Sequence, residues 1–150
     1  MSHLLKIKRL TDTAVLPIKA HDSDAGIDIY ADEDVVLKPN KTVLVSTGIS
    51  MVIPEGYAGF IWDRSSMGVK GLHRFAGVIV SGYRGEVKVC ICNVSYGLSE
   101  WPFCQGKYFI RLGDKIAQII IQEVPNFRIE EVEHLDNTDR GEGGFGSSGK

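Results

Sequence analysis

The chain has 150 residues, of which 43% are hydrophobic and 24% charged, so the simplest expectation is one soluble globular domain with its own core. Its formal net charge of −2 gives no electrostatic reason to expect binding to nucleic acid or to an anionic membrane. The apolar runs fall well short of the ~20 residues that cross a bilayer, and the first residues lack a signal-peptide core, so a cytoplasmic location is expected.

Short apolar segments separated by glycine and turn residues dominate the chain, and several of them alternate apolar with polar residues. The expected strands, in chain order, are Leu4–Arg9, Ile27–Tyr30, Val35–Leu37, Thr42–Ser46, Ile49–Ile53, Tyr57–Trp62, Ala76–Val80, Glu86–Asn93, Tyr108–Leu112, Ile116–Val124 and Arg128–His134. Only Ser66–Leu72 suits a helix, and the two glycines within it predict a short one. Many short strands at this spacing predict an all-β sandwich or closed barrel.

The composition changes after Leu135, where the expected strands end and a polar, glycine-rich segment begins. This change predicts a β domain over residues 1–135 and a flexible tail over residues 136–150. Residues 95–107 are expected to form a long loop that carries Trp101 and Phe103. The two aromatic side chains suit either a surface for a protein partner or a small apolar cluster within the loop.

The cysteines and histidines predict no metal centre made by the protein alone. Cys90 and Cys92 lie two residues apart on one expected strand, and the odd total of three cysteines without a C-x-x-C pair argues against a disulfide framework or a zinc site. The four histidines are scattered along the chain. A metal ion is therefore expected to arrive together with a ligand.

Small polar residues interrupt the apolar pattern in four segments, which are Ala25–Asp28, Arg64–Ser66, Gly77–Glu86 and Gly113–Gln118. Taken singly, they have ordinary explanations, because Asp28 would cap a turn and Arg64 would be a surface charge. Arg84 and Glu86 are expected to form an ion pair or an interface contact. Gln118 is more informative, since an amide within a strongly apolar strand requires hydrogen-bond partners.

The tail from Arg140 to Gly149 contains one arginine, one phenylalanine, two serines and five glycines. Arginine, hydroxyl groups and exposed backbone N–H groups suit a phosphate chain, and Phe145 suits stacking on a flat base. Alone, such a segment buries too little surface to become ordered. A flexible glycine- and serine-rich terminus without a ligand is therefore the alternative interpretation.

In this order, the four segments and the tail resemble the five motifs of the trimeric deoxyuridine triphosphatase (dUTPase) family. The resemblance extends from about residue 4 to the C-terminus. It implies a jelly-roll-type β domain that assembles as a homotrimer, with active sites between subunits and each site closed by a tail from another subunit. It also implies cleavage of dUTP to dUMP and pyrophosphate with Mg²⁺.

The resemblance further implies a role for each motif. The backbone of Gly77, Val78 and Ile79 would read the uracil edge and exclude thymine, and Tyr83 would pack under the deoxyribose. The residues expected to hold the phosphate chain are Arg64, Ser65, Ser66 and Gln118.

The remaining roles concern the metal and the tail. Asp28 would orient the hydration shell of a Mg²⁺ ion bound mainly through the triphosphate, since Mg²⁺ usually keeps several waters. The tail residues expected to grip the γ-phosphate and cover the base are Arg140, Phe145, Gly146, Ser147 and Ser148. Closure of the tail would expel water and align the phosphate chain for attack.

The chain departs from the family pattern at Val80, where the resemblance implies an aspartate that activates the attacking water. Valine accepts no proton, and general-base assistance is typically worth about 10²–10⁴-fold in rate. Because the other motifs are present, we expect dUTP to bind but to be hydrolysed slowly. Asp63, next to Arg64, is the acid considered as a substitute.

Two other functions are weighed against hydrolysis of dUTP. A catalytically inactive protein would sense dUTP and act on a protein partner through the loop over residues 95–107. A dCTP deaminase is disfavoured, because the segment Tyr83–Gly85 and the tail with Phe145 follow the dUTPase pattern.

Overall fold

A computed structural model describes residues 4–94 and 106–143. Its elements are β1 (Lys6–Arg9), β2 (Ile27–Tyr30), β3 (Val35–Leu37), β4 (Thr42–Val45), β5 (Ile49–Val52), β6 (Tyr57–Trp62), α1 (Ser65–Gly68), β7 (Leu72–Phe75), β8 (Val78–Val80), β9 (Val89–Asn93), β10 (Tyr108–Ile110) and β11 (Lys115–Glu123). The predicted all-β, jelly-roll-type fold with one short helix is confirmed. Within the described residues, no helix is long and apolar enough to cross a membrane.

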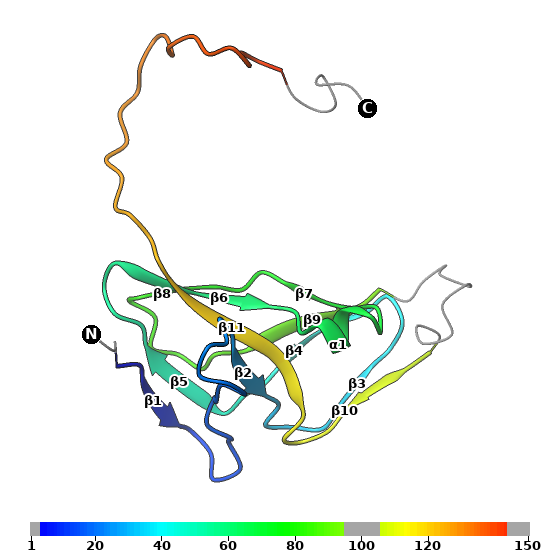
Figure 1. Cartoon of the computed structure of the whole chain (residues 1–150). Helices are drawn as coiled ribbons and strands as arrows, with labels where there is room; N and C mark the ends of the chain where they lie inside the picture. The colour runs from blue at the N-terminus through cyan, green and yellow to red at the C-terminus, as the bar shows by residue number, and fades with distance from the viewer. Residues whose placement is uncertain (1–3, 95–105, 144–150) are drawn as a thin grey trace.

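All the strand pairs are antiparallel and join segments that are far apart in the chain (Figure 1). The largest sheet has the order β2-β11-β6-β8, and a second sheet has the order β4-β9-β7. Two further pairs, β1 with β5 and β10 with β3, complete the β domain. Strand β11 is central, since it pairs with β2 on one side and with β6 on the other.

The core lies under these sheets and consists almost wholly of aliphatic side chains. The fully buried aliphatic residues are Ile29, Leu37, Val45, Ile49, Ile53, Leu72, Val87, Val89, Ile91, Ile110 and Ile119. Ile29 and Ile119 come from paired strands of the largest sheet, so their burial fixes the register in which β2 and β11 meet. The same register brings the polar residues of these two strands together outside the core.

The helix differs from its prediction, because α1 covers Ser65–Gly68 and not Ser66–Leu72. Gly71 has a positive φ of 71°, a backbone conformation that ends the helical turn and lets Leu72 begin β7. The expected strand Ala76–Val80 is shorter for a similar reason, since Ala76 also has a positive φ. Only Val78–Val80 pairs with β6.

The expected strand Arg128–His134 is not formed in the single chain. Beyond β11 the chain runs away from the β domain as far as residue 143 (Figure 1). Its apolar side chains have no described residues to pack against there, and Ile129 is 95% exposed and Leu135 84% exposed. A strand needs a partner for its backbone groups, and none is present on this side of the described chain.

Candidate functional site

A clamp of two cations on one carboxylate is the centre of the site. Asp28 lies on β2, and one of its carboxylate oxygens contacts the Nε of Arg64 at 3.0 Å. The other oxygen contacts the Nζ of Lys115 at 2.6 Å. This hydrogen bond raises the pKa of Lys115, so the ammonium stays charged. The Asp28 side chain is only 13% exposed, and it holds the two cations side by side.

An irregularity in β11 lets two of its side chains reach the same cavity. The pairing register with β2 shifts between Lys115 and Ala117, so that Gln118 lies opposite Asp28. A bulge of this kind adds one residue to a strand and redirects the side chains around it. Lys115 and Gln118 therefore both line the cavity around Asp28, although regular alternation would turn them to opposite faces.

Gly26 makes room for the Gln118 side chain. A Cβ atom at Gly26 would lie 2.1 Å from the Oε1 of Gln118, closer than any real contact allows. The Nε2 of Gln118 donates to the backbone carbonyl of Asp63 at 2.9 Å, which fixes the orientation of the amide. The cavity lined by Gly26, Asp28, Arg64 and Gln118, together with Ser65 and Lys115, has a volume of about 360 Å³ and is called the Asp28 cavity below.

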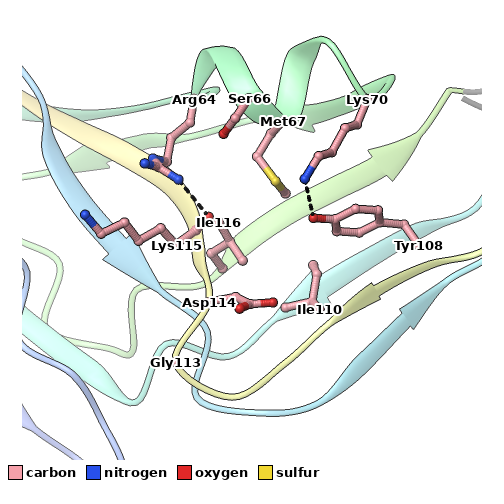
Figure 2. A pocket seen from close by; sticks show the side chains of 10 residues that line it. All are labelled: Arg64, Ser66, Met67, Lys70, Tyr108, Ile110, Gly113, Asp114, Lys115 and Ile116. Atoms are coloured by element: carbon pink, nitrogen blue, oxygen red, sulfur yellow. Dashed lines mark hydrogen bonds between the residues drawn. The ribbon is translucent and has the colours of Figure 1, made fainter. Parts of the chain in front are cut away.

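The predicted phosphate-binding residues of α1 lie around this cavity. The NH1 atom of Arg64 also donates to the carbonyl of Lys115 at 3.3 Å, which ties the start of α1 to the start of β11. Ser65 lines the Asp28 cavity, whereas Ser66 faces a neighbouring cavity (Figure 2). Both serines are exposed, so their hydroxyl groups are accessible to a ligand.

The predicted base-binding hairpin lies elsewhere on the same sheet. Strand β8 pairs with β6 through one edge only, because it ends the sheet. Two of its side chains point outward, since Val78 is 65% exposed and Val80 59% exposed, while Ile79 packs against the core. The hydroxyl of Tyr83 donates to the carbonyl of Glu86 at 2.9 Å and holds the ring beside the strand. A cavity of about 310 Å³, the Val80 cavity, is lined by residues that include Val78, Val80 and Tyr83.

The Asp28 and Val80 cavities lie towards opposite ends of β6. Val80 pairs with Ala58, whereas Gln118 pairs with Trp62. Four residues along a strand correspond to about 13 Å. One chain therefore brings Asp28 together with the predicted phosphate-binding residues, and it leaves Val80 and Tyr83 apart from them.

The acid considered as a substitute for the missing aspartate has other partners. One oxygen of Asp63 lies 2.5 Å from the Nδ1 of His73, and the other accepts the backbone N–H of Arg74 at 2.8 Å. Both oxygens thus hold the start of β7 against the end of β6. This geometry gives Asp63 a structural role and offers no support for the suggestion that it activates water.

The ion pair expected between Arg84 and Glu86 is wrong, and the interface contact given as its alternative stays a prediction. Arg84 donates to the backbone carbonyls of Ser81 and Tyr83 within its own turn. Glu86 instead contacts Lys88 at 3.3 Å. Its carboxylate also accepts hydrogen bonds from the Ser46 hydroxyl and from the backbone N–H groups of residues 47 and 48. Sequence proximity suggested the wrong partner, because the turn before β5 approaches Glu86 only in the folded chain.

Glu86 provides a test of stability in the β domain. Burial raises the pKa of Glu86, but the hydrogen bonds from Ser46 and from the backbone N–H of residue 48, with the charge of Lys88, outweigh burial and lower the pKa overall. At neutral pH, replacing Glu86 with glutamine is expected to lower the free energy of unfolding by about 1–3 kcal/mol. A carboxyl with a lowered pKa stabilises the fold above its unfolded-state pKa and loses this contribution as pH falls through the folded-state value.

Thermal unfolding at several pH values measures this effect. The difference between the parent and Glu86→Gln should be largest near neutral pH and should shrink in acid. Glu55→Gln is the control, because Glu55 is exposed in the turn after β5 and should leave the midpoint unchanged. An equal loss for Glu86→Gln at every pH would contradict the role of the ionised carboxylate.

The tail residues are placed only in part. Arg140 is exposed, and its Nε donates to the carbonyl of Gly143 at 2.9 Å. It contacts neither cavity in the single chain. The other tail predictions, Phe145, Gly146, Ser147 and Ser148, lie outside the described residues, as do Trp101 and Phe103.

Lys115 is the residue of the Asp28 cavity that sequence reasoning missed. It stands inside the segment Gly113–Gln118, but only Gln118 received a role there. The signal for Lys115 depends on the pairing of β11 with β2, which brings it to Asp28 from far along the chain. No local pattern around Lys115 reveals that partner.

The acids of the Asp28 cavity bear on how a metal ion could bind. Within residues 4–94 and 106–143, no group of three or more His, Cys, Asp or Glu side chains could hold a metal ion. Two acids line the Asp28 cavity, and both oxygens of Asp28 already contact cations. One oxygen of the other acid, Asp24, accepts the backbone N–H of His21. The donor set therefore does not suit a bare divalent cation, but it suits a cation that arrives on an anionic ligand.

Comparisons with known proteins agree on one family. A family model described as dUTPase matches residues 12–149. A deoxyuridine 5'-triphosphate nucleotidohydrolase of Rhodococcus erythropolis is 40% identical over 148 residues, which cover 97% of this chain and 85% of that protein. The enzyme of the same description from Nocardia farcinica is 43% identical over 148 residues, with the same coverage.

Solved structures show the same relationship. The dUTPase of Staphylococcus bacteriophage 80alpha with dUpNHpp has a TM-score of 0.89 and 31% identity, and the match covers 99% of this chain and all of that one. It was described in work on phage dUTPases that control transfer of virulence genes by a G protein-like mechanism. A variant of the dUTPase from phage phi11 of S. aureus, described with a structural Mg(II) ion, has a TM-score of 0.80 and 29% identity, covering 90% of this chain and all of that one.

Proposed function

Because the chain belongs to the dUTPase family, we propose that it binds dUTP with Mg²⁺ and that its site is arranged to hydrolyse dUTP to dUMP and pyrophosphate. The observation that carries this proposal is the Asp28 cavity. Arg64 and Ser65 at the start of α1 meet Gln118 of β11 there, with Lys115 beside them. The guanidinium, ammonium, hydroxyl and amide donors that line this cavity suit a triphosphate.

In this proposal, Arg64, Ser65 and Gln118 donate to oxygens of the phosphate chain, with Ser66 at its far end. Asp28 fixes the guanidinium of Arg64 before the substrate arrives, so little ordering is needed on binding. The hydrogen bond from Gln118 to the backbone of Asp63 fixes the amide in the same way. These residues bind and orient; none of them is placed to take a proton from water.

The hairpin at β8 suits recognition of the base. One edge of β8 pairs with β6, and the carbonyl of Gly77 accepts the backbone N–H of Ile61 on that side. The other edge is free, so the N–H and C=O groups of Val78, which alternate with those of Gly77, are presented to a ligand. The edge of uracil can form hydrogen bonds with such backbone groups. The methyl group of thymine at the same place would collide with backbone atoms. Tyr83 beside this edge is the proposed platform for the deoxyribose.

A homotrimer would bring the separated parts together. About 13 Å of β6 separate the base-binding hairpin from the phosphate-binding residues in one chain, so we propose that a hairpin from one subunit faces the Asp28 cavity of the next. The apolar side chains that the extended segment exposes, such as Ile129 and Leu135, support a second subunit as their cover. The tail with Arg140 would then close a site on another subunit.

Mg²⁺ enters this proposal with the nucleotide. When bound to the phosphates, it would neutralise part of their charge and polarise the bond to be cleaved. Asp28 would contact the water shell of the ion, as the family resemblance implies, while Arg64 and Lys115 hold the carboxylate in place.

This arrangement leads to a prediction about metal binding. Without nucleotide, we expect no binding of Mg²⁺ at about 1 mM, because Asp28 already contacts two cations. With dUpNHpp present, adding EDTA should weaken nucleotide binding while leaving the thermal midpoint of the free protein unchanged. Calorimetry with each partner alone and with both together measures this. Saturable binding of Mg²⁺ to the free protein would contradict the expectation.

Product analysis tests the proposed activity. At high protein concentration, dUTP with Mg²⁺ should slowly give dUMP and pyrophosphate, whereas UTP and dTTP should give far less product. Arg64→Ala is the matched control, because it removes a phosphate contact and leaves the hairpin intact. Equal turnover of dUTP and dTTP, or turnover unaffected by Arg64→Ala, would contradict the assignment of the site.

The second candidate is a protein that binds dUTP without hydrolysing it and acts on a protein partner. Val80 favours this candidate, because an exposed valine stands at the position where the family resemblance implies the water-activating aspartate. The loop over residues 95–107 is the proposed contact surface. Binding of dUTP with no detectable product, even at high protein concentration, would favour this candidate over the enzyme.

A further inference from the structure

A third cavity lies directly beside the Asp28 cavity, between α1 and the turn before β11 (Figure 2). It has a volume of about 380 Å³, a size that suits small-molecule ligands. Arg64 and Lys115 line both cavities, so the two spaces meet at these residues. We call it the Lys70 cavity, after a residue to which neither the motifs nor the proposed function gives a role.

Lys70 is a cation without an acidic partner among the described residues. Its half-buried side chain reaches down from the end of α1 (Figure 2), and its Nζ lies 3.1 Å from the hydroxyl of Tyr108. The same ammonium lies 5.1 Å from the centroid of the Tyr108 ring. Arg64 and Lys115, by contrast, both contact Asp28. Of the three cations that line the cavity, Lys70 is thus the one whose charge no carboxylate offsets within the described chain.

The balance of charge and donors around the cavity favours an anion. Its lining holds three cations and one carboxylate, Asp114, and with Asp28, which contacts two of these cations from the neighbouring cavity, the formal charge is +1. One oxygen of Asp114 already accepts the backbone N–H of Arg111 at 2.8 Å. The hydroxyl groups of Ser66 and Tyr108 add further donors at the two ends of the space (Figure 2). An anion with several oxygens could accept from both ends at once.

We infer that the Lys70 cavity binds inorganic pyrophosphate as it leaves the Asp28 cavity. The inference rests on the proposed function, which forms pyrophosphate next to Arg64. The leaving pyrophosphate would keep its contact with Arg64 while it forms new contacts with the ammonium of Lys70 and the hydroxyl of Tyr108. Lys70 and Tyr108 are then product-binding residues, and they take no part in binding the base or the sugar.

Calorimetric titration of the full-length protein with sodium pyrophosphate, with and without Mg²⁺, tests the inference. Lys70→Met should weaken pyrophosphate binding roughly tenfold or more, because it removes a charged donor and keeps most of the side-chain volume. Tyr108→Phe should weaken it less, since the ring under Lys70 remains. Binding of dUMP should be unchanged in both variants. Lys38→Met is the control, because Lys38 is exposed and lies outside the cavity.

Unchanged pyrophosphate binding in both folded variants would overturn the inference, and so would an equal loss in Lys38→Met. Thermal unfolding of each variant shows whether it is folded. The proposed function fails in a different way: dUpNHpp would then not bind at all, whereas pyrophosphate binding that depends on Lys70 would still identify the cavity as an anion site.

Discussion

Replacing Val80 with aspartate is expected to raise the rate of dUTP hydrolysis by about 10²–10⁴-fold. The structure indicates that aspartate at this position would be tolerated, because Val80 is 59% exposed on the edge strand β8. Aspartate there would neither bury a charge nor leave a cavity in the core, so the fold should be preserved. It would supply the proton acceptor that is missing from the proposed site.

Val78→Asp is the matched control for this experiment. Val78 lies on the same strand and points outward like Val80, but two residues nearer to the start of the hairpin. The Val78→Asp variant should add the same charge without raising the rate of dUTP hydrolysis. Pyrophosphate release from dUTP with Mg²⁺ compares the two variants with the parent. Equal rates in the parent and Val80→Asp would mean that another group activates water, and the pair formed by Asp63 and His73 would be examined first.

Mixing two inactive variants should restore activity if each site draws on more than one subunit. In the Val80→Asp background, a chain that ends at residue 135 lacks Arg140 and the rest of the tail, and a full-length Arg64→Ala chain lacks a phosphate contact. Each variant alone loses charge-assisted hydrogen bonds worth about 1.5–3 kcal/mol apiece, or roughly 10–100-fold in rate. Mixed trimers would contain some sites that have both Arg64 and a tail.

The control for mixing is a single chain that carries both changes. A chain that carries Arg64→Ala and ends at residue 135 should rescue neither single variant by more than dilution explains. Native mass spectrometry shows whether mixed assemblies form. Mixed assemblies without any recovery of activity would contradict the proposal that tails close sites on other subunits.

Local sequence patterns were sufficient for much of the fold. Ile27–Tyr30, Val35–Leu37 and Tyr57–Trp62 form strands with the predicted boundaries, because short apolar segments bounded by turns can be read from nearby residues alone. Strand β7 was missed, since Leu72–Phe75 becomes a strand only through its long-range pairing with β9. The segment Arg128–His134 has an apolar pattern but no strand partner among residues 4–94 and 106–143, so it forms no strand there.

The candidate site could be predicted as a set of residues but not as an arrangement. The motifs identified Asp28, Arg64 and Gln118, and the structure brings these three together around one cavity. The clamp that Lys115 and Arg64 form on Asp28 depends on strand register and on the bulge in β11, which no short pattern specifies. The separation of Val80 from the Asp28 cavity likewise appears only once β6 is seen to connect them.

Titration of the unmodified protein with dUpNHpp and Mg²⁺ is the most direct measurement, because it examines binding without requiring turnover. Saturable binding with a Kd of about 10 μM or below is expected, together with at least tenfold weaker binding of dTTP. Binding should also weaken in Arg64→Ala. No saturable binding of dUpNHpp at roughly 1 mM would contradict both the enzyme and the sensing protein.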